Sequence, residues 1–129
     1  MKKVKMLLVK PMEVPCVVKI DSMGEGIEAL LGGPREAFFP DGNKSVFYYH
    51  EWGKAQGLPL NRAICDSRGE VYDIVAGNFI ICRPNSKGKD LFRDLPEALI
   101  EKYSLMFAQP EDPGSLLVTA TILHNWQRR

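Results

Sequence analysis

The sequence predicts an α+β fold: a mainly antiparallel sheet of about five or six strands, with two helices packed on it. Short segments rich in Val, Ile, Phe and Tyr, separated by turn residues, recur between residues 3 and 83 and are typical of strands. A later segment, residues 95–107, instead repeats apolar side chains at helical spacing. The chain has 129 residues, 45% of them hydrophobic and 26% charged, which suits one well-buried core.

The first strands are predicted as two hairpins. Residues 3–9 and 15–20 are rich in Val, Ile and Leu, and a short connection that contains a proline separates them. Residues 36–39 and 45–52 flank the turn residues Asp41, Gly42, Asn43 and Lys44. Each pair is therefore expected to run antiparallel.

Both helices are predicted to start at a capping box, in which a short polar side chain and a glutamate three residues later satisfy free backbone N–H groups. Ser22 and Glu25 precede a short helix over residues 27–31, which Gly32 and Gly33 end. Asp94 and Glu97 open the second helix. Its expected packing face comprises Leu95, Leu99, Tyr103, Met106 and Phe107.

The remaining elements lie between and after these. Residues 71–83 are the most apolar stretch, and the part from Asn78 to Arg83 is predicted as a central strand. We expect residues 1–109 to form the α+β domain and residues 110–129 a C-terminal extension packed on it. Within that extension, the β-branched residues of 116–126 favour a strand, but the length of the segment also permits a helix.

Charge and composition narrow the class of protein. The formal net charge of +1 makes duplex nucleic acid an unlikely partner, although a local basic patch is compatible with it. No stretch approaches the ~20 apolar residues of a membrane span, so no membrane association is expected. Cys16, Cys65 and Cys82 are odd in number and widely spaced, which is typical of reduced thiols in a cytoplasmic protein.

Neither a metal nor a cofactor is expected. The two histidines, His50 and His124, are far apart, and no pair of cysteines has the spacing of a zinc site. The glycines near the first helix form no dinucleotide-binding fingerprint, and helix ends and turns explain them. No catalytic residue is predicted, because Cys65, Asp66 and His50 lack any supporting pattern.

The most informative polar residues lie between positions 57 and 79. Arg62 has a planar guanidinium suited to phosphate or carboxylate. One interpretation is a structural lock, in which Arg62 pairs with Asp66 or Asp73. The other is a ligand-binding site formed by Asn61, Arg62, Tyr72, Asp73 and Asn78.

Tyr48 is a further candidate for ligand binding. On a strand, Tyr48, His50 and Trp52 share one face, because side chains alternate along the strand. Such a face can stack a planar ligand or a base. It can equally form part of the core and its rim.

The same central segment resembles an uncharacterised family of small proteins found in phages, plasmids and conjugative elements, chiefly of Gram-positive bacteria. The resemblance rests on Gly57-Leu58-Pro59-x-Asn61-Arg62 followed by Gly69-x-x-Tyr72-Asp73-Ile74 and Gly77-x-Phe79. It extends over residues 3–107, and the tail from Pro110 onward departs from it. The resemblance implies a mobile-element setting and no established activity.

That setting leads to the functional expectation. Small proteins of phages often block host defence, so we expect a non-catalytic binding protein that sequesters a nucleotide signal. One alternative is a protein-interaction module that inhibits a host enzyme, and the protein is then expected to have a host partner. Another is a small hydrolase that uses Asp66, Glu70, Asp73 or His50 for acid–base chemistry. A homo-oligomer is compatible with each.

Overall fold

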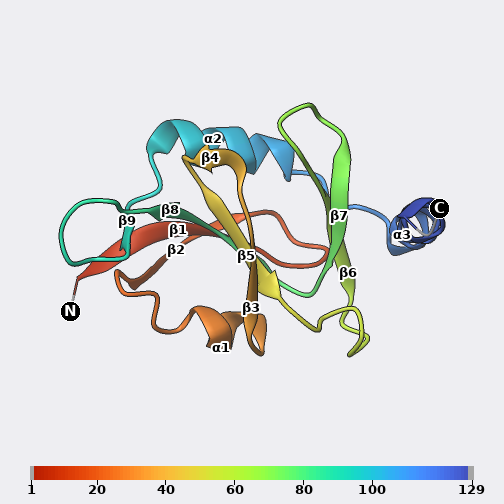
Figure 1. Cartoon of the computed structure of the whole chain (residues 1–129), viewed down its shortest axis with the longest axis horizontal. Helices are drawn as coiled ribbons and strands as arrows, with labels where there is room; N and C mark the ends of the chain where they lie inside the picture. Colours follow the sequence, from red (N-terminus) through yellow and green to blue (C-terminus); the bar gives the residue numbers. More distant parts are fainter. Residues whose placement is uncertain (1, 128–129) are drawn as a thin grey trace.

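The computed structural model describes residues 2–127 and confirms the α+β fold, with a six-stranded antiparallel sheet (Figure 1). The sheet order is β2-β1-β8-β5-β3, with β9 paired to β8, and β6 and β7 form a second, two-stranded sheet. The strands are β1 (Lys3–Val9), β2 (Cys16–Asp21), β3 (Arg35–Phe38), β4 (Pro40–Asn43), β5 (Val46–His50), β6 (Leu60–Cys65), β7 (Val71–Ala76), β8 (Phe79–Pro84) and β9 (Phe92–Arg93). The helices are α1 (Ile27–Leu31), α2 (Glu97–Met106) and α3 (Pro113–Gln127).

The strand pairing confirms the two predicted hairpins and the central strand. β1 pairs with β2 from Lys3 opposite Asp21 onward, and β3 pairs with β5 so that Phe38 lies opposite Phe47. β8 lies between β1 and β5, with Ile81 in register with residues of each. The apolar side chains of β8 are consequently buried on both faces of the sheet.

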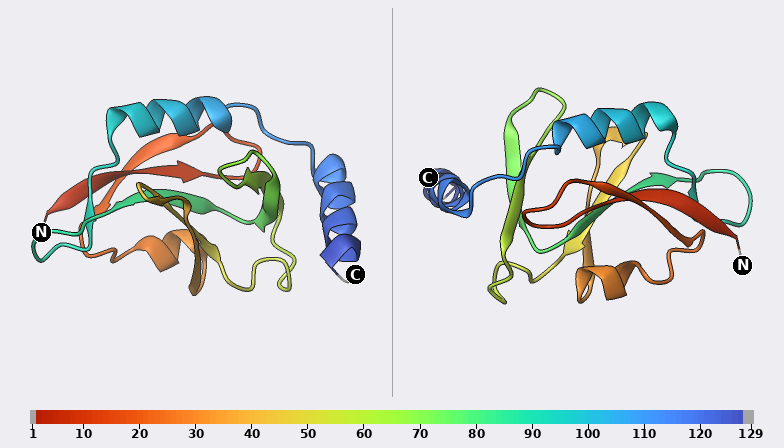
Figure 2. Two further views of the ribbon diagram at one scale, coloured as in Figure 1. Left: turned by 45° about the horizontal axis from the view of Figure 1, so that its top comes forward. Right: turned by 180° about the vertical axis from the view of Figure 1, so that it is seen from behind.

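Two hydrophobic clusters lie on opposite faces of this sheet. One contains Phe47 and Phe79 with Tyr103 and Phe107, which α2 and the residue after it supply. The other contains Val46, Ile80 and Phe92 with Ile27 and Leu31 of α1. Figure 2 shows α2 and α1 on opposite sides of the sheet. Met106, predicted on the packing face of α2, is instead 53% exposed, so that prediction is wrong.

The β6–β7 sheet extends the first cluster, and α3 packs against it. Ile64 of β6 and Val75 of β7 join the aromatic cluster under α2. Leu116 of α3 is buried, and the Glu111 carboxylate before this helix accepts a hydrogen bond from the Ala63 backbone N–H at 2.7 Å. Residues 116–126 belong to α3, so the predicted helix, and not the predicted strand, is correct.

Both predicted capping boxes are wrong. The Ser22 hydroxyl donates to Asp90 at 2.7 Å, and α1 follows Gly26 with no side-chain cap. The Asp94 carboxylate accepts from the Lys5 backbone N–H at 2.8 Å, and α2 follows Pro96, again with no side-chain cap. In each case the polar side chain contacts a segment far away in the sequence. None of the helices in the described part of the chain has the length and hydropathy needed to cross a membrane.

Candidate ligand-binding site

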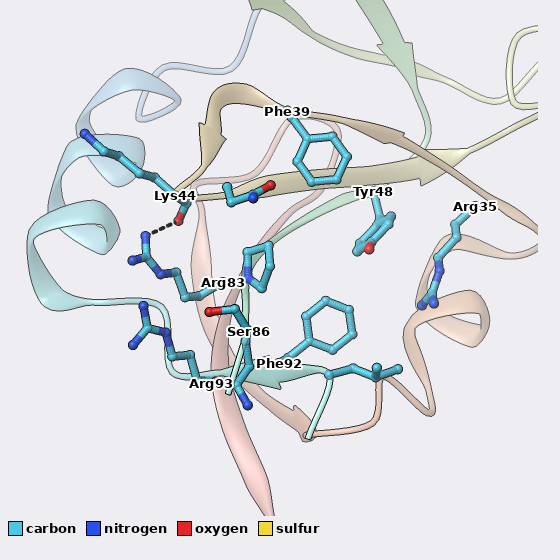
Figure 3. Close-up of a pocket in the computed structure, with 12 residues that line it drawn as sticks. Arg35, Phe39, Lys44, Tyr48, Arg83, Ser86, Phe92 and Arg93 are labelled. Carbon is cyan, nitrogen blue, oxygen red and sulfur yellow. Dashed lines mark hydrogen bonds between the residues drawn. The ribbon is translucent and has the colours of Figure 1, made fainter. Parts of the chain in front are cut away.

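A cavity of about 580 Å³ opens between the β3–β5 hairpin and the β8–β9 hairpin (Figure 3). It lies on the side of the sheet that carries α1, since Phe92 and Tyr48 in its wall belong to that cluster. Its lining residues are Arg35, Phe39, Asn43, Lys44, Tyr48, Arg83, Pro84, Asn85, Ser86, Leu91, Phe92 and Arg93. They come from two parts of the chain, residues 35–48 and 83–93, so the cavity forms only when the sheet has assembled.

The lining carries four cations and no carboxylate. Lys44 pairs with Asp41 at 3.6 Å, in an exposed ion pair. Among the described residues, no carboxylate lies within ion-pair distance of Arg35, Arg83 or Arg93. The near-neutral net charge of the chain therefore conceals a local positive patch.

Arg83 and Arg93 are held beside each other by backbone pairing. They are partners in the antiparallel register of β8 and β9, and side chains in such pairs extend on the same face of a sheet. Arg83 Nη1 donates to the Lys44 carbonyl oxygen at 2.6 Å. Its Nε is buried and has no hydrogen-bond partner within the described part of the chain. A buried donor without a partner costs stability.

Aromatic side chains form the rest of the wall. The Tyr48 and Phe92 rings meet edge to face, with centroids 5.9 Å apart, and the Arg35 guanidinium lies 4.6 Å from the Tyr48 centroid. Phe39 is 49% exposed at the rim. Burial raises the pKa of the Tyr48 phenol, and the nearby Arg35 charge opposes this shift in part. The phenol therefore stays neutral at physiological pH and can donate a hydrogen bond.

Gly24 allows the backbone to approach two residues of the cavity wall closely. Its φ is +81°, and a Cβ at this position would lie 2.8 Å from Phe92 Cε2 and 3.4 Å from Arg35 Nη1. Any side chain here would displace the Phe92 ring, which is nearly fully buried. The positions of Phe92 and Arg35 thus depend on a glycine more than 10 residues away in the sequence.

Of the six candidate residues from the sequence, Tyr48 lines this cavity, and the other five lie elsewhere. Arg62 is 1% exposed, and its Nη2 donates to the carbonyl oxygens of Glu13 at 2.6 Å and Phe107 at 3.0 Å. Its Nη1 donates to Asn61 Oδ1 at 2.7 Å. Backbone and amide oxygens, rather than Asp66 or Asp73, therefore surround this guanidinium.

Asn61 continues the same network. Its Nδ2 donates to the carbonyl oxygens of Val9 and Gly77, each at 2.9 Å. Burial lowers the pKa of Arg62, and the Glu111 charge partly opposes that shift. Together the two side chains connect the β1–β2 loop, β6, the β7–β8 turn and the end of α2, an arrangement that favours the structural lock.

The other three candidates have separate surroundings. The Asn78 side chain donates to the Leu30 carbonyl oxygen at 2.9 Å and so attaches the β7–β8 turn to α1. Asp73 forms an ion pair with Lys54. The Tyr72 ring, 48% exposed, stacks on Phe38 with centroids 4.1 Å apart. These residues do not converge on one site.

The groups suggested for a hydrolase are also apart from this cavity. Cys65 and Asp66 line a second hollow of about 430 Å³, and His50 and Asp73 a third of about 210 Å³. Burial and the Asp66 charge raise the pKa of the Cys65 thiol, which disfavours the reactive thiolate. In the part of the chain that the structure describes, no three His, Cys, Asp or Glu side chains cluster as metal ligands do.

Sequence reasoning missed Arg35, Lys44, Arg83 and Arg93. Lys44 belongs to a predicted turn and Arg83 ends a predicted strand, but nothing in the sequence indicates that β9 brings Arg93 next to Arg83. The sequence indicates only that a chain of near-neutral net charge can still carry a local basic patch.

Comparison with known proteins gives one match. Residues 2–108 match the model of DUF3846, described as a domain of unknown function. All residues that line the cavity fall within this range, and α3 falls outside it. No curated protein and no solved structure matches the chain.

Proposed function

We propose that this chain, which belongs to the DUF3846 family of domains of unknown function, is a non-catalytic protein that binds a small nucleotide in the cavity around Tyr48. One observation carries the proposal: Arg83 and Arg93 stand opposite each other, beside an aromatic wall, and no carboxylate among the described residues pairs with them. A phosphorylated planar molecule satisfies both features at once.

The basic end supports recognition of phosphate. Like charges directly opposite on paired strands repel each other, so an anion between them stabilises the folded protein. Guanidinium groups bind phosphate through two parallel N–H donors, and such charge-assisted hydrogen bonds are roughly twice as strong as neutral ones. Arg83 and Arg93 therefore form the expected phosphate contact, with Lys44 at the rim.

The aromatic wall supports recognition of the base. Tyr48 and Phe92 line the cavity with Phe39 at its rim, and a base stacked on an aromatic side chain gains ~1–3 kcal/mol. Pockets for small ligands are commonly ~300–1,000 Å³ in volume and combine apolar walls with a few polar groups. A volume of about 580 Å³ is compatible with a nucleotide.

The lining also supports binding without catalysis. It contains no His, Asp, Glu or Cys, the side chains that most often transfer protons or attack substrates. Arginine stays protonated at physiological pH and acts mainly as a fixed positive charge. The bound nucleotide is therefore expected to leave unchanged.

We further propose that this binding serves a phage or other mobile element by sequestering a nucleotide signal of host defence in the cytoplasm. The resemblance of the central motif to mobile-element proteins motivates this role. A second candidate, an interaction module that inhibits a host enzyme, is favoured by the exposed apolar side chains Leu117, Val118 and Ile122 of α3. The two roles differ in whether a nucleotide alone binds.

Native mass spectrometry with a panel of linear and cyclic nucleotides tests the proposal. We expect a stoichiometric mass shift, recovery of the intact nucleotide after denaturation, and loss of the shift in Arg83→Gln. Arg68→Gln is the matched control, because that arginine is 76% exposed on the β6–β7 turn. Recovery of a converted nucleotide would establish an enzyme. The absence of any shift would direct attention to a protein partner.

A further inference from the structure

We infer that the ligand is a nucleotide unit with a phosphate group on each side of its nucleoside, as in a nucleoside 3′,5′-bisphosphate. This inference rests on the proposed function and concerns the same cavity. It is carried by the position of Arg35, at the opposite end of the cavity from the other three cations.

The cavity has two basic ends with aromatic rings between them. In Figure 3 the side chains of Lys44, Arg83 and Arg93 lie on one side of the rings of Phe39, Tyr48 and Phe92 and extend away from them, and Arg35 lies on the other side. The strand pairing explains the separation. Arg35 begins β3, at one edge of the sheet, whereas Arg83 and Arg93 lie at the junction of β8 and β9. A ring stacked on the wall would therefore have positive charge on each side.

Arg35 has no charged partner in the part of the chain that the structure describes. Among the described residues, its guanidinium forms no ion pair and no hydrogen bond, although it carries five N–H donors. Its contact with the Tyr48 ring, at 4.6 Å from the centroid, holds it in the cavity wall. Cation–π contact leaves the donors at the edge of the guanidinium free for an anion.

The loop before α1 provides space for this arrangement. A Cβ at Gly24 would lie 3.4 Å from Arg35 Nη1 and 2.8 Å from Phe92 Cε2. Glycine thus allows the charged end and the aromatic wall to approach the same backbone. This close approach fixes the positions of Arg35 and Phe92 at that end of the cavity.

These features distinguish two ligands of similar charge. A nucleoside 5′-diphosphate carries its phosphates as one chain, which reaches one basic end. A nucleoside 3′,5′-bisphosphate carries them on separate oxygens, so one can contact Arg83 and Arg93 while the other contacts Arg35. One additional charge-assisted hydrogen bond corresponds to roughly a tenfold difference in affinity.

Isothermal titration of the full chain with adenosine and guanosine 3′,5′-bisphosphates and 5′-diphosphates tests the inference. We expect the bisphosphate of the preferred base to bind about tenfold more tightly than its diphosphate. In Arg35→Gln the two should bind within about twofold of each other. In Arg93→Gln both should weaken by about tenfold while the preference remains. Thermal unfolding of each variant verifies that it is folded, and Arg35→Lys, which keeps the charge, should retain part of the preference.

The outcomes separate this inference from the proposed function. Equal affinity of wild type for the two ligands, or equal weakening of both in Arg35→Gln, would overturn the inference and leave nucleotide binding in place. Failure of every nucleotide to bind would overturn the proposed function and the inference with it. A 5′-phosphorylated trinucleotide that binds much more tightly than the bisphosphate would replace the small ligand with a single-stranded nucleic acid.

Discussion

Arg83 and Arg93 are direct partners across β8 and β9, and within the described part of the chain neither guanidinium has a carboxylate at ion-pair distance. Such a pair is unusual, since like charges opposite each other on neighbouring strands cost roughly 0.2–1 kcal/mol. The pair therefore lowers the stability of the empty protein and, under the proposed function, is where the phosphate binds.

Replacing one arginine of the pair should therefore raise the stability of the protein and weaken its binding of nucleotide. We expect Arg93→Gln to raise the free energy of unfolding of the ligand-free protein by roughly 0.2–1 kcal/mol, because it removes the repulsion. The same variant should bind nucleotide more weakly. Urea denaturation at low salt measures the first effect and titration calorimetry the second. Arg68→Gln, the surface control, should not stabilise the protein, since Arg68 lies near the opposite charges of Asp66 and Glu70. A loss of stability in Arg93→Gln would contradict the explanation.

Arg62 should be required for folding stability and not for binding. We expect Arg62→Met to lower the free energy of unfolding by roughly 2–4 kcal/mol, because it leaves the carbonyl oxygens of Glu13 and Phe107 buried without donors. Urea denaturation measures the loss, with Arg68→Met as the exposed control. The folded fraction of Arg62→Met should bind nucleotide as wild type does. A variant that folds well and fails to bind would instead place the site near Arg62.

The fold was predictable because its elements carry local patterns. Apolar stretches with flanking turns identify β1, β2, β5 and β8, and the spacing of Leu95, Leu99 and Tyr103 identifies α2. The sequence does not predict β6, because Asn61 and Arg62 interrupt its apolar pattern and are buried through long-range hydrogen bonds. The capping boxes were wrong for a related reason: Ser22 and Asp94 find partners on distant segments.

The candidate site was much less predictable. Tyr48 was identified because its strand is rich in aromatic residues, and its placement in the cavity depends on neighbours from other strands. Arg93 lies on a strand of two residues, too short to produce a recognisable pattern. Its pairing with Arg83 depends on the course of the loop between β8 and β9. Asn61 and Arg62, in contrast, stand out in the sequence but form hydrogen bonds that connect segments inside the fold.

Gly24 should matter for the cavity as well as for its own backbone. We expect Gly24→Ala to destabilise the protein by roughly 2–4 kcal/mol, because it combines the strain of a positive φ with a clash at Phe92. Gly32→Ala is the matched control: its φ of +82° is nearly the same, and nothing lies within 4 Å of the added Cβ. That variant should lose roughly 1–2 kcal/mol and bind nucleotide normally. Thermal and urea unfolding measure both variants. If Gly24→Ala and Gly32→Ala lose the same free energy of unfolding, the Phe92 ring moves aside at no cost and the expected clash is absent.

Tyr49 should make the protein sensitive to alkali. Burial raises the pKa of its phenol, and the negative charges of Glu36 and Asp73 add to the effect. Above pH ~10 the phenol of the unfolded chain loses its proton while the buried phenol keeps it, so the unfolded state binds fewer protons. The free energy of unfolding then falls as pH rises, by up to about 1.4 kcal/mol per pH unit for one such group. In Tyr49→Phe this contribution is absent, so urea denaturation between about pH 9 and 11 should show a shallower decline than in wild type, with little change in shape below pH 9. An identical decline in the two proteins would mean that the phenol reaches solvent despite its 5% exposure.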